Sequence, residues 1–238
     1  MRRQLTWIFL LAVTLTAAAQ KSNPMAYYIN EKGEEAMSTN ITDGQAPLEV
    51  TFRANPEGMD GYTPSFEWHF RHSPFTKTGE TQEFKEFMVR YEEDTQYTFT
   101  ESGIYHIVLL TRLSASLDPD SATIILSISD SKLEFPNAFS PNHDGRNELY
   151  QAKTGWRNIV SFHAYIFNRW GQKLFEWTDP NDGWDGTYKG KDVKEGTYFV
   201  LVKARGADGK EYNIKKDVNL LRNYYQGSGS NSSSTAGQ

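Results

Sequence analysis

Apolar residues at every second position are the feature of this sequence that most restricts its fold. The segments PLEVTFRAN and SFEWHF both show this alternation, with Leu48, Val50 and Phe52 in the first and Phe66, Trp68 and Phe70 in the second. Neighbouring residues of a strand point to opposite faces, so the alternation predicts strands with one buried face. The segments GIYHIVLLTR and ATIILSIS predict longer strands that are buried more completely. Aromatic residues make up 14% of the chain, which also favours β-structure.

Turn signals separate these segments at short intervals. Asp-Gly, Ser-Gly and Asp-Pro pairs stand at 43–44, 60–61, 102–103 and 118–119, and short strands spaced in this way are typical of β-sandwiches. Helical periodicity is limited to EEAMSTNITDG and FKEFMVRYEED. A second set of strand-like segments follows Ser131: IVSFHAYIFNRWG, QKLFEW, GTYFVLVKARG and KEYNIKKDVNLLR, with a hairpin signal at Asp208-Gly209. The sequence therefore predicts an all-β chain with two tandem sandwiches, 20–130 and 131–226, that meet near 130–132.

The sequences at the two ends of the chain are not typical of packed structure. Residues 1–19 combine a basic start, a short apolar run and small residues at Ala17 and Ala19, which is the pattern of a secretory signal peptide cleaved after Ala19. The apolar run from Leu5 to Leu15 is too short to span a bilayer, which needs about 20 residues. We therefore expect no transmembrane segment in the mature chain. Residues 227–238, GSGSNSSSTAGQ, predict a flexible tail.

Charge and cysteine content exclude several classes of protein. The formal net charge is −5, and loss of Arg2 and Arg3 with the signal peptide takes it to −7. No block of basic residues stands out, so nucleic acid and anionic lipid are not expected as partners. The chain has no cysteine, so an exported protein of this kind must rely on packed cores or bound ions in place of disulfides.

The segment FPNAFSPNHDGRNELY, at 135–150, is dense in turn residues and allows two interpretations. Side-chain oxygens of Asn142, Asp144, Asn147 and Glu148 are the hard ligands that calcium prefers. The alternative is a loop in which Asn and Asp accept hydrogen bonds from nearby backbone amides. The spacing is not that of an EF-hand, and His143 has no nucleophile at a suggestive spacing. We predict no catalytic residues, and calcium is the one cofactor left open.

Three segments of the first half occur in a recognisable order. PLEVTFRA, FEWHF and YTFTESGIYHIVLL together resemble a PKD-type domain, an immunoglobulin-like sandwich. The chain departs from that pattern in HFRHSPF, which replaces Asp-Phe-Gly, and in a long loop from His72 to Glu92. The resemblance implies a spacer or adhesive module. His69 and His72 could be taken as metal ligands, but residues three apart on a strand face opposite sides, so we expect a partly exposed histidine pair.

Four blocks of the second half also occur in order: FSPNHDGRNE, NRWG, the segment from WDG to GTY, and a final LLR. The set resembles the gliding-motility-associated C-terminal domain of Bacteroidota. His143 stands where that family often has glycine, and a tail of twelve residues follows where the family usually ends. The resemblance implies a type IX secretion signal, recognised by the outer-membrane export machinery, which would carry the protein from the periplasm to the cell surface or medium.

The residues of these blocks have two interpretations. They shape tight turns, with glycine at positive φ and Asn or Asp bonding backbone amides, or they contact the export machinery directly. We expect the N–H groups of both Trp170 and Trp184 to stay in water. The candidate recognition residues are Asn168, Arg169, Trp170, Gly171, Trp184, Asp185, Gly186, Leu220, Leu221 and Arg222. A separate short motif, Asp120-Ser121-Ala122, resembles an O-glycosylation site of the same bacteria at Ser121.

These observations favour a non-enzymatic surface or secreted protein with an immunoglobulin-like passenger and a C-terminal export signal. The passenger would bind a surface glycan or a protein. Three other functions stay open: a structural or accessory component of the secretion and gliding apparatus, a carbohydrate-binding module that uses Trp68, Trp170 and Trp184 as stacking platforms, and a hydrolase.

Overall fold

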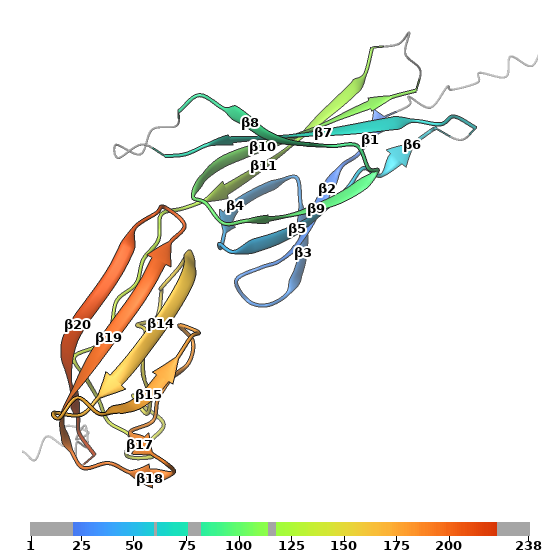
Figure 1. The fold of residues 1–238 in the computed structure, drawn as a ribbon. Coiled ribbons are helices and arrows are strands. Elements are labelled where there is room, and N and C mark those ends of the chain that lie inside the picture. The colour runs from blue at the N-terminus through green and yellow to red at the C-terminus, as the bar shows by residue number, and fades with distance from the viewer. Residues whose placement is uncertain (1–20, 60, 76–81, 114–117, 223–238) are drawn as a thin grey trace, which may run out of the picture.

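The computed structural model describes residues 21–59, 61–75, 82–113 and 118–222. The expected signal peptide and tail lie outside these residues. The described part consists of strands, turns and loops, arranged as two immunoglobulin-like β-sandwiches (Figure 1). The all-β prediction is therefore confirmed. None of the described residues forms a helix with the length and apolarity needed to cross a bilayer.

The first sandwich packs a five-stranded sheet against a four-stranded one. The larger sheet has the order β4-β11-β10-β7-β8 and the smaller has the order β3-β2-β5-β9. The strands of the larger sheet are β4 (Asn40–Gly44), β7 (Ser65–Ser73), β8 (Lys85–Arg90), β10 (Gly103–Arg112) and β11 (Asp120–Ile128). Those of the smaller sheet are β2 (Met25–Ile29), β3 (Glu35–Ser38), β5 (Leu48–Arg53) and β9 (Asp94–Phe99), and a separate pair is formed by β1 (Lys21–Ser22) and β6 (Pro56–Glu57).

The alternating residues of the sequence form the core between these sheets. Phe52 of β5 lies 5.4 to 6.2 Å, centroid to centroid, from the rings of Trp68, Phe70 and Phe99, and all four side chains are fully buried. The indole N–H of Trp68 donates to the backbone carbonyl of Glu92 at 3.0 Å. A buried aromatic cluster whose one polar atom is satisfied stabilises the sandwich without a disulfide.

The two segments with helical periodicity form strands. EEAMSTNITDG contains β3 and β4, and FKEFMVRYEED contains β8. All three strands lie at the edges of their sheets, where charged side chains are tolerated because one side of the strand faces solvent. Pairing with the neighbouring strand decides the conformation of these segments. The periodicity of a short segment does not reveal that pairing.

The second sandwich is built on one large sheet, β12-β20-β19-β14-β15. Its strands are β12 (Ala138–Phe139), β14 (Ile159–Phe167), β15 (Lys173–Trp177), β19 (Gly196–Gly206) and β20 (Glu211–Leu220). Two short pairs complete the domain, β13 (Tyr150–Gln151) with β16 (Gly183–Trp184), and β17 (Thr187–Tyr188) with β18 (Lys191–Asp192). Its core is separate from that of the first sandwich.

A polar joint holds the two sandwiches together. Asn158 is 1% exposed, and its side-chain oxygen accepts a hydrogen bond from the backbone N–H of Ala46, at 2.9 Å. Its amide nitrogen donates to the carbonyl of Ser129 at 2.7 Å. The backbone N–H of Ser102 donates to the carbonyl of Ala207 in the β19–β20 turn, and Ala207 belongs to the core of the first sandwich. The junction is thus a packed interface.

We expect the variant Asn158→Gly to loosen this joint. Asn158 has φ of 54°, which glycine adopts without strain, so the variant removes the side chain and leaves the buried N–H of Ala46 without its partner. An unsatisfied buried donor costs about 1–3 kcal/mol. Because the chain has no cysteine, spin labels can be placed at Thr123→Cys and Lys203→Cys. The distance distribution between them should broaden in the variant, and it should stay unchanged in the exposed control Asn213→Ala.

Candidate functional site

The four sequence blocks of the second half meet at one end of the second sandwich. This end carries the hairpin β17–β18 and lies away from the first sandwich (Figure 1). Four segments reach it: the loop at 140–148, the turn at 168–172, the segment 184–198, and residues 220–222 at the end of β20. We call this region the distal end.

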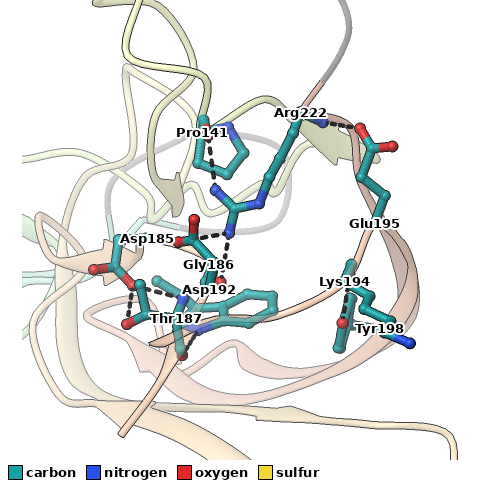
Figure 2. A network of polar contacts seen from close by, with 10 residues as sticks. Pro141, Asp185, Gly186, Thr187, Asp192, Lys194, Glu195, Tyr198 and Arg222 are labelled. Atoms are coloured by element: carbon teal, nitrogen blue, oxygen red, sulfur yellow. Dashed lines mark hydrogen bonds and ion pairs between the residues drawn. The ribbon is translucent and has the colours of Figure 1, made fainter. Parts of the chain in front are cut away.

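The guanidinium of Arg222 connects three of these blocks (Figure 2). Its Nη1 donates to the carbonyl of Pro141 at 2.9 Å, and its Nη2 donates to the carbonyl of Gly186 at 2.8 Å. Nη2 also lies 3.1 Å from a carboxylate oxygen of Asp192. The backbone N–H of Arg222 donates to the carboxylate of Glu195. The side chain of Arg222 is only 19% exposed, and this one residue fastens the segment after β20 to two loops that are distant in sequence.

Close packing around Gly186 explains why this position requires glycine. The residue has φ of +79°, and a Cβ atom added there would lie 2.9 Å from Leu220, 3.0 Å from Pro141 and 3.1 Å from Arg222. Both the backbone conformation and the space exclude a side chain. The sequence interpretation of Gly186 as a turn residue is consistent with this geometry, and the contact with Arg222 adds a reason that the sequence did not show.

Trp184 lies in the core. Its side chain is fully buried, its ring is 5.0 Å from that of Tyr198 and 5.4 Å from that of Phe139, and its N–H donates to the carbonyl of Thr187 at 2.7 Å. The expectation that this N–H faces water was wrong, because the turn after Trp184 folds back and supplies an acceptor. Asp185 holds that turn by accepting a hydrogen bond from the backbone N–H of Thr187 at 2.9 Å.

The NRWG turn, in contrast, presents its tryptophan to solvent. The side-chain oxygen of Asn168 accepts hydrogen bonds from the backbone N–H groups of Trp170 and Gln172, both at 3.0 Å. Gly171 has φ of +78°, which closes the turn. Trp170 is 81% exposed, and the guanidinium of Arg169 lies 5.5 Å from the centre of its ring. The hydrogen-bonded turn therefore holds one aromatic residue, Trp170, in an exposed position.

A cavity of about 560 Å³ lies beside this turn. Blocks that are distant in sequence contribute to its walls, which are formed by Asn168, Arg169, Trp170, Gln172, Leu174, Tyr188, Val193, Lys194, Glu195, Gly196, Thr197 and Tyr198. The amide of Gln172 donates to the hydroxyl of Tyr188 at 3.2 Å and connects the turn to the hairpin. Burial raises the pKa of Tyr198, and the charge of Arg222 opposes this shift only in part. The tyrosine therefore stays neutral, with its hydroxyl bonded to the carbonyl of Lys194 at 2.6 Å.

The loop at 140–148 uses its side-chain oxygens to bind its own backbone. Asn142 accepts a hydrogen bond from the N–H of Asp144 at 3.2 Å, Asp144 accepts one from Arg146 at 2.8 Å, and Glu148 accepts one from Gly145 at 3.0 Å. Partial desolvation would raise the pKa of the Glu148 carboxyl, but hydrogen bonds from backbone N–H groups outweigh it and keep this pKa below its ordinary value.

These hydrogen bonds agree with the interpretation of 140–148 as a loop whose Asn and Asp side chains bind nearby backbone amides. The described residues contain no group of three His, Asp or Glu side chains arranged to hold a metal ion. The predicted calcium ligands, which also include Asn147, stay a prediction. His143, at the position where the resembled family often has glycine, adopts φ of 65°, a conformation that glycine reaches more easily.

The remaining predicted residues lie in varied environments. Leu220 is buried in the core, and Leu221 is 39% exposed. Ser121 is exposed on β11. His69 and His72 have separate partners, since the Nδ1–H of His69 donates to the carboxylate of Glu86 at 2.7 Å while the ring of His72 stacks on that of Tyr105, with 4.2 Å between centroids. The two histidines do not converge on a common point.

Sequence reasoning missed several residues of the distal end: Pro141, Asp192, Glu195, Tyr188 and Lys194. Each acts through a contact with a distant block, either around Arg222 or around the cavity. Spacing within a segment gives no signal for such contacts.

A comparison with protein families finds a match in this region. Residues 133–218 match the family model of the CHU_C type IX secretion signal domain. The matched stretch contains the loop, the turn and the hairpin described above, and it supports export through the type IX system. No curated protein matches the chain.

Several solved structures show similarity to the chain. A Bacteroides ovatus protein of the mixed-linkage glucan utilization locus, SGBP-B, solved with a mixed-linkage heptasaccharide, has 13% identity and a TM-score of 0.25 over 76% of this chain and 42% of its own. Fibronectin(III)-like modules of Clostridium thermocellum CbhA have 12% identity and a TM-score of 0.22 over 77% and 88%. The FN1-FN3 domains of chicken CNTN1 have 8% identity and a TM-score of 0.29 over 81% and 73%. The chain thus spans less than half of the first of these structures.

Proposed function

We propose that this protein is a non-enzymatic cell-surface or secreted protein, with the second sandwich as its type IX export signal and the first as its passenger. The observation that carries the proposal is the match of residues 133–218 to the secretion signal family, together with the assembly of its sequence blocks at one end of a folded domain. The signal is then a folded surface, and its recognition requires the intact second sandwich.

The distal end divides the candidate recognition residues by role. Trp184 and Leu220 are buried and Gly186 is closely packed, so these residues stabilise the fold of the distal end and do not contact a partner. Arg169 and Trp170 are exposed on a rigid turn, so they are the residues that a partner would touch. This end points away from the first sandwich (Figure 1), which leaves it accessible while the passenger is attached.

For the passenger we propose a PKD-like binding or adhesive role. Its core is built on its own aromatic residues, with Ala207 of the second sandwich added at the junction, and it has an exposed sheet face on which Ser121 lies. Trp68 and Trp184 are fully buried and cannot stack on sugar rings, so the carbohydrate-binding alternative retains only Trp170 of its three platforms. A component of the secretion apparatus would share the same folded domain, and location separates that alternative from our proposal.

Protease treatment of intact cells tests the location. The full chain is produced in a host that has a type IX system, and the cells are treated with a protease that does not cross the outer membrane. We expect the surface-bound protein to be degraded in intact cells while a periplasmic marker survives. Protection of the protein until the cells are lysed, with none in the medium, would contradict surface exposure.

A further inference from the structure

The distal end carries cations that have no ionic partner among the residues that the structure describes. Arg169, Lys189, Lys191 and Lys194 are all exposed, and among the described residues none of them forms an ion pair with a carboxylate. Four such cations within 26 residues contrast with a chain whose net charge is −5.

The carboxylates of the same region are already engaged. Asp192 pairs with the guanidinium of Arg222 at 3.1 Å, and Asp185 accepts hydrogen bonds from both the N–H and the hydroxyl of Thr187. Glu195 accepts a hydrogen bond from the backbone of Arg222. These contacts, visible in Figure 2, give each of the three carboxylates a partner within the domain, although the side chain of Asp192 stays 66% exposed. Beside the NRWG turn and the hairpin, exposed cations remain that no ion pair offsets within the described part of the chain: Arg169, Lys189 and Lys194.

Two of these cations lie over aromatic rings. The Lys189 ammonium lies 5.3 Å from the ring centre of Tyr188, and the Arg169 guanidinium lies 5.5 Å from that of Trp170. Trp170, Tyr188 and Lys194 line the cavity of about 560 Å³. Tryptophan, tyrosine and arginine are the residues that most often dominate the binding energy of protein interfaces.

We propose that the surface formed by Arg169, Trp170, Tyr188, Lys189 and Lys194 docks onto an acidic protein surface of the export machinery. This inference rests on the proposed function and adds the chemistry of the partner. Two of the cations lie over separate rings and do not converge on one point, as a site for a single phosphate would require. Dispersed cations around an exposed tryptophan fit several carboxylates on a protein, which would guide the encounter electrostatically.

Charge reversal tests the proposal in the full chain. In the double variant Arg169→Glu/Lys194→Glu, we expect the exported fraction to fall by about tenfold or more, because like charges then face the acidic partner. The matched control is Lys203→Glu/Lys215→Glu, which reverses two exposed lysines on β19 and β20 of the same domain and changes the net charge equally. Export of the control should stay within about twofold of the parent. The thermal midpoints of all three proteins should agree, because the changed side chains are exposed.

A photocrosslinking residue at position 170 identifies what the surface touches in cells. We expect a crosslinked protein adduct in cells that have the type IX export channel. We expect this adduct to be lost in the Arg169→Glu/Lys194→Glu background. An adduct with glycan or lipid alone, normal export of that double variant, or an equal defect in the control would overturn the proposal. If deletion of the channel stops export while the Arg169→Glu/Lys194→Glu variant is exported normally, the export function stands and only the acidic partner is refuted.

Discussion

The variant Trp184→Ala is expected to unfold the second sandwich at temperatures where the parent is folded. The side chain is fully buried and contacts Phe139 and Tyr198, and truncation of a buried tryptophan costs about 3–5 kcal/mol. Whole domains are stabilised by only about 5–15 kcal/mol. Calorimetry of the full chain should show the transition of the second sandwich lowered by more than about 12 °C.

Export should fail together with folding in this variant. The control for thermal stability alone is Trp170→Ala, which removes the same side chain from a position that is 81% exposed and should leave the midpoint within about 2 °C of the parent. A Trp184→Ala protein that unfolds as predicted and is nevertheless exported normally would show that the signal is a linear segment, in contradiction to a folded surface.

The variant Arg222→Ala is expected to release the segment after β20 from the distal loops. The carbonyls of Pro141 and Gly186 lose their donor, and the carboxylate of Asp192 loses its partner. Each hydrogen bond from a charged donor contributes about 1.5–3 kcal/mol, so we expect a loss of about 2–4 kcal/mol. Hydrogen exchange should show faster exchange of the amides in 186–193.

Arg222→Lys separates charge from geometry. Lysine keeps the positive charge but lacks the planar fork that reaches two carbonyls and a carboxylate at once. We expect Arg222→Lys to recover less than half of the stability lost in Arg222→Ala. Full recovery would mean that charge near Asp192 is sufficient and that the two carbonyl contacts contribute little.

The core strands were predictable because their signal is local. The segments GIYHIVLLTR and GTYFVLVKARG became β10 and β19 with the predicted bounds, since alternation reports directly on which face is buried. On β19, Tyr198 and Val200 face the core while Phe199 between them is 42% exposed. The edge strands β3, β4 and β8 were harder to predict, because their conformation depends on a neighbouring strand that the local sequence does not contain.

The distal end was predictable only as a set of turns. Asn168, Asp185 and Gly186 act within their own segments as expected. The bridge from Arg222 to Pro141 spans 81 positions, and the joint from Asn158 to Ala46 spans 112. Contacts at such separations depend on the assembled fold, so a single sequence identifies the residue types and leaves their partners unknown. For the same reason the sequence did not distinguish buried Trp184 from exposed Trp170.

The most direct test of the export account is the location of the full chain in cells with and without the type IX channel. We expect the protein at the surface or in the medium when the channel is intact. When the channel is deleted, we expect it to disappear from both and to accumulate in the periplasm. An unchanged distribution between the two strains would contradict the account, and it would favour a component that carries this fold and stays inside the outer membrane.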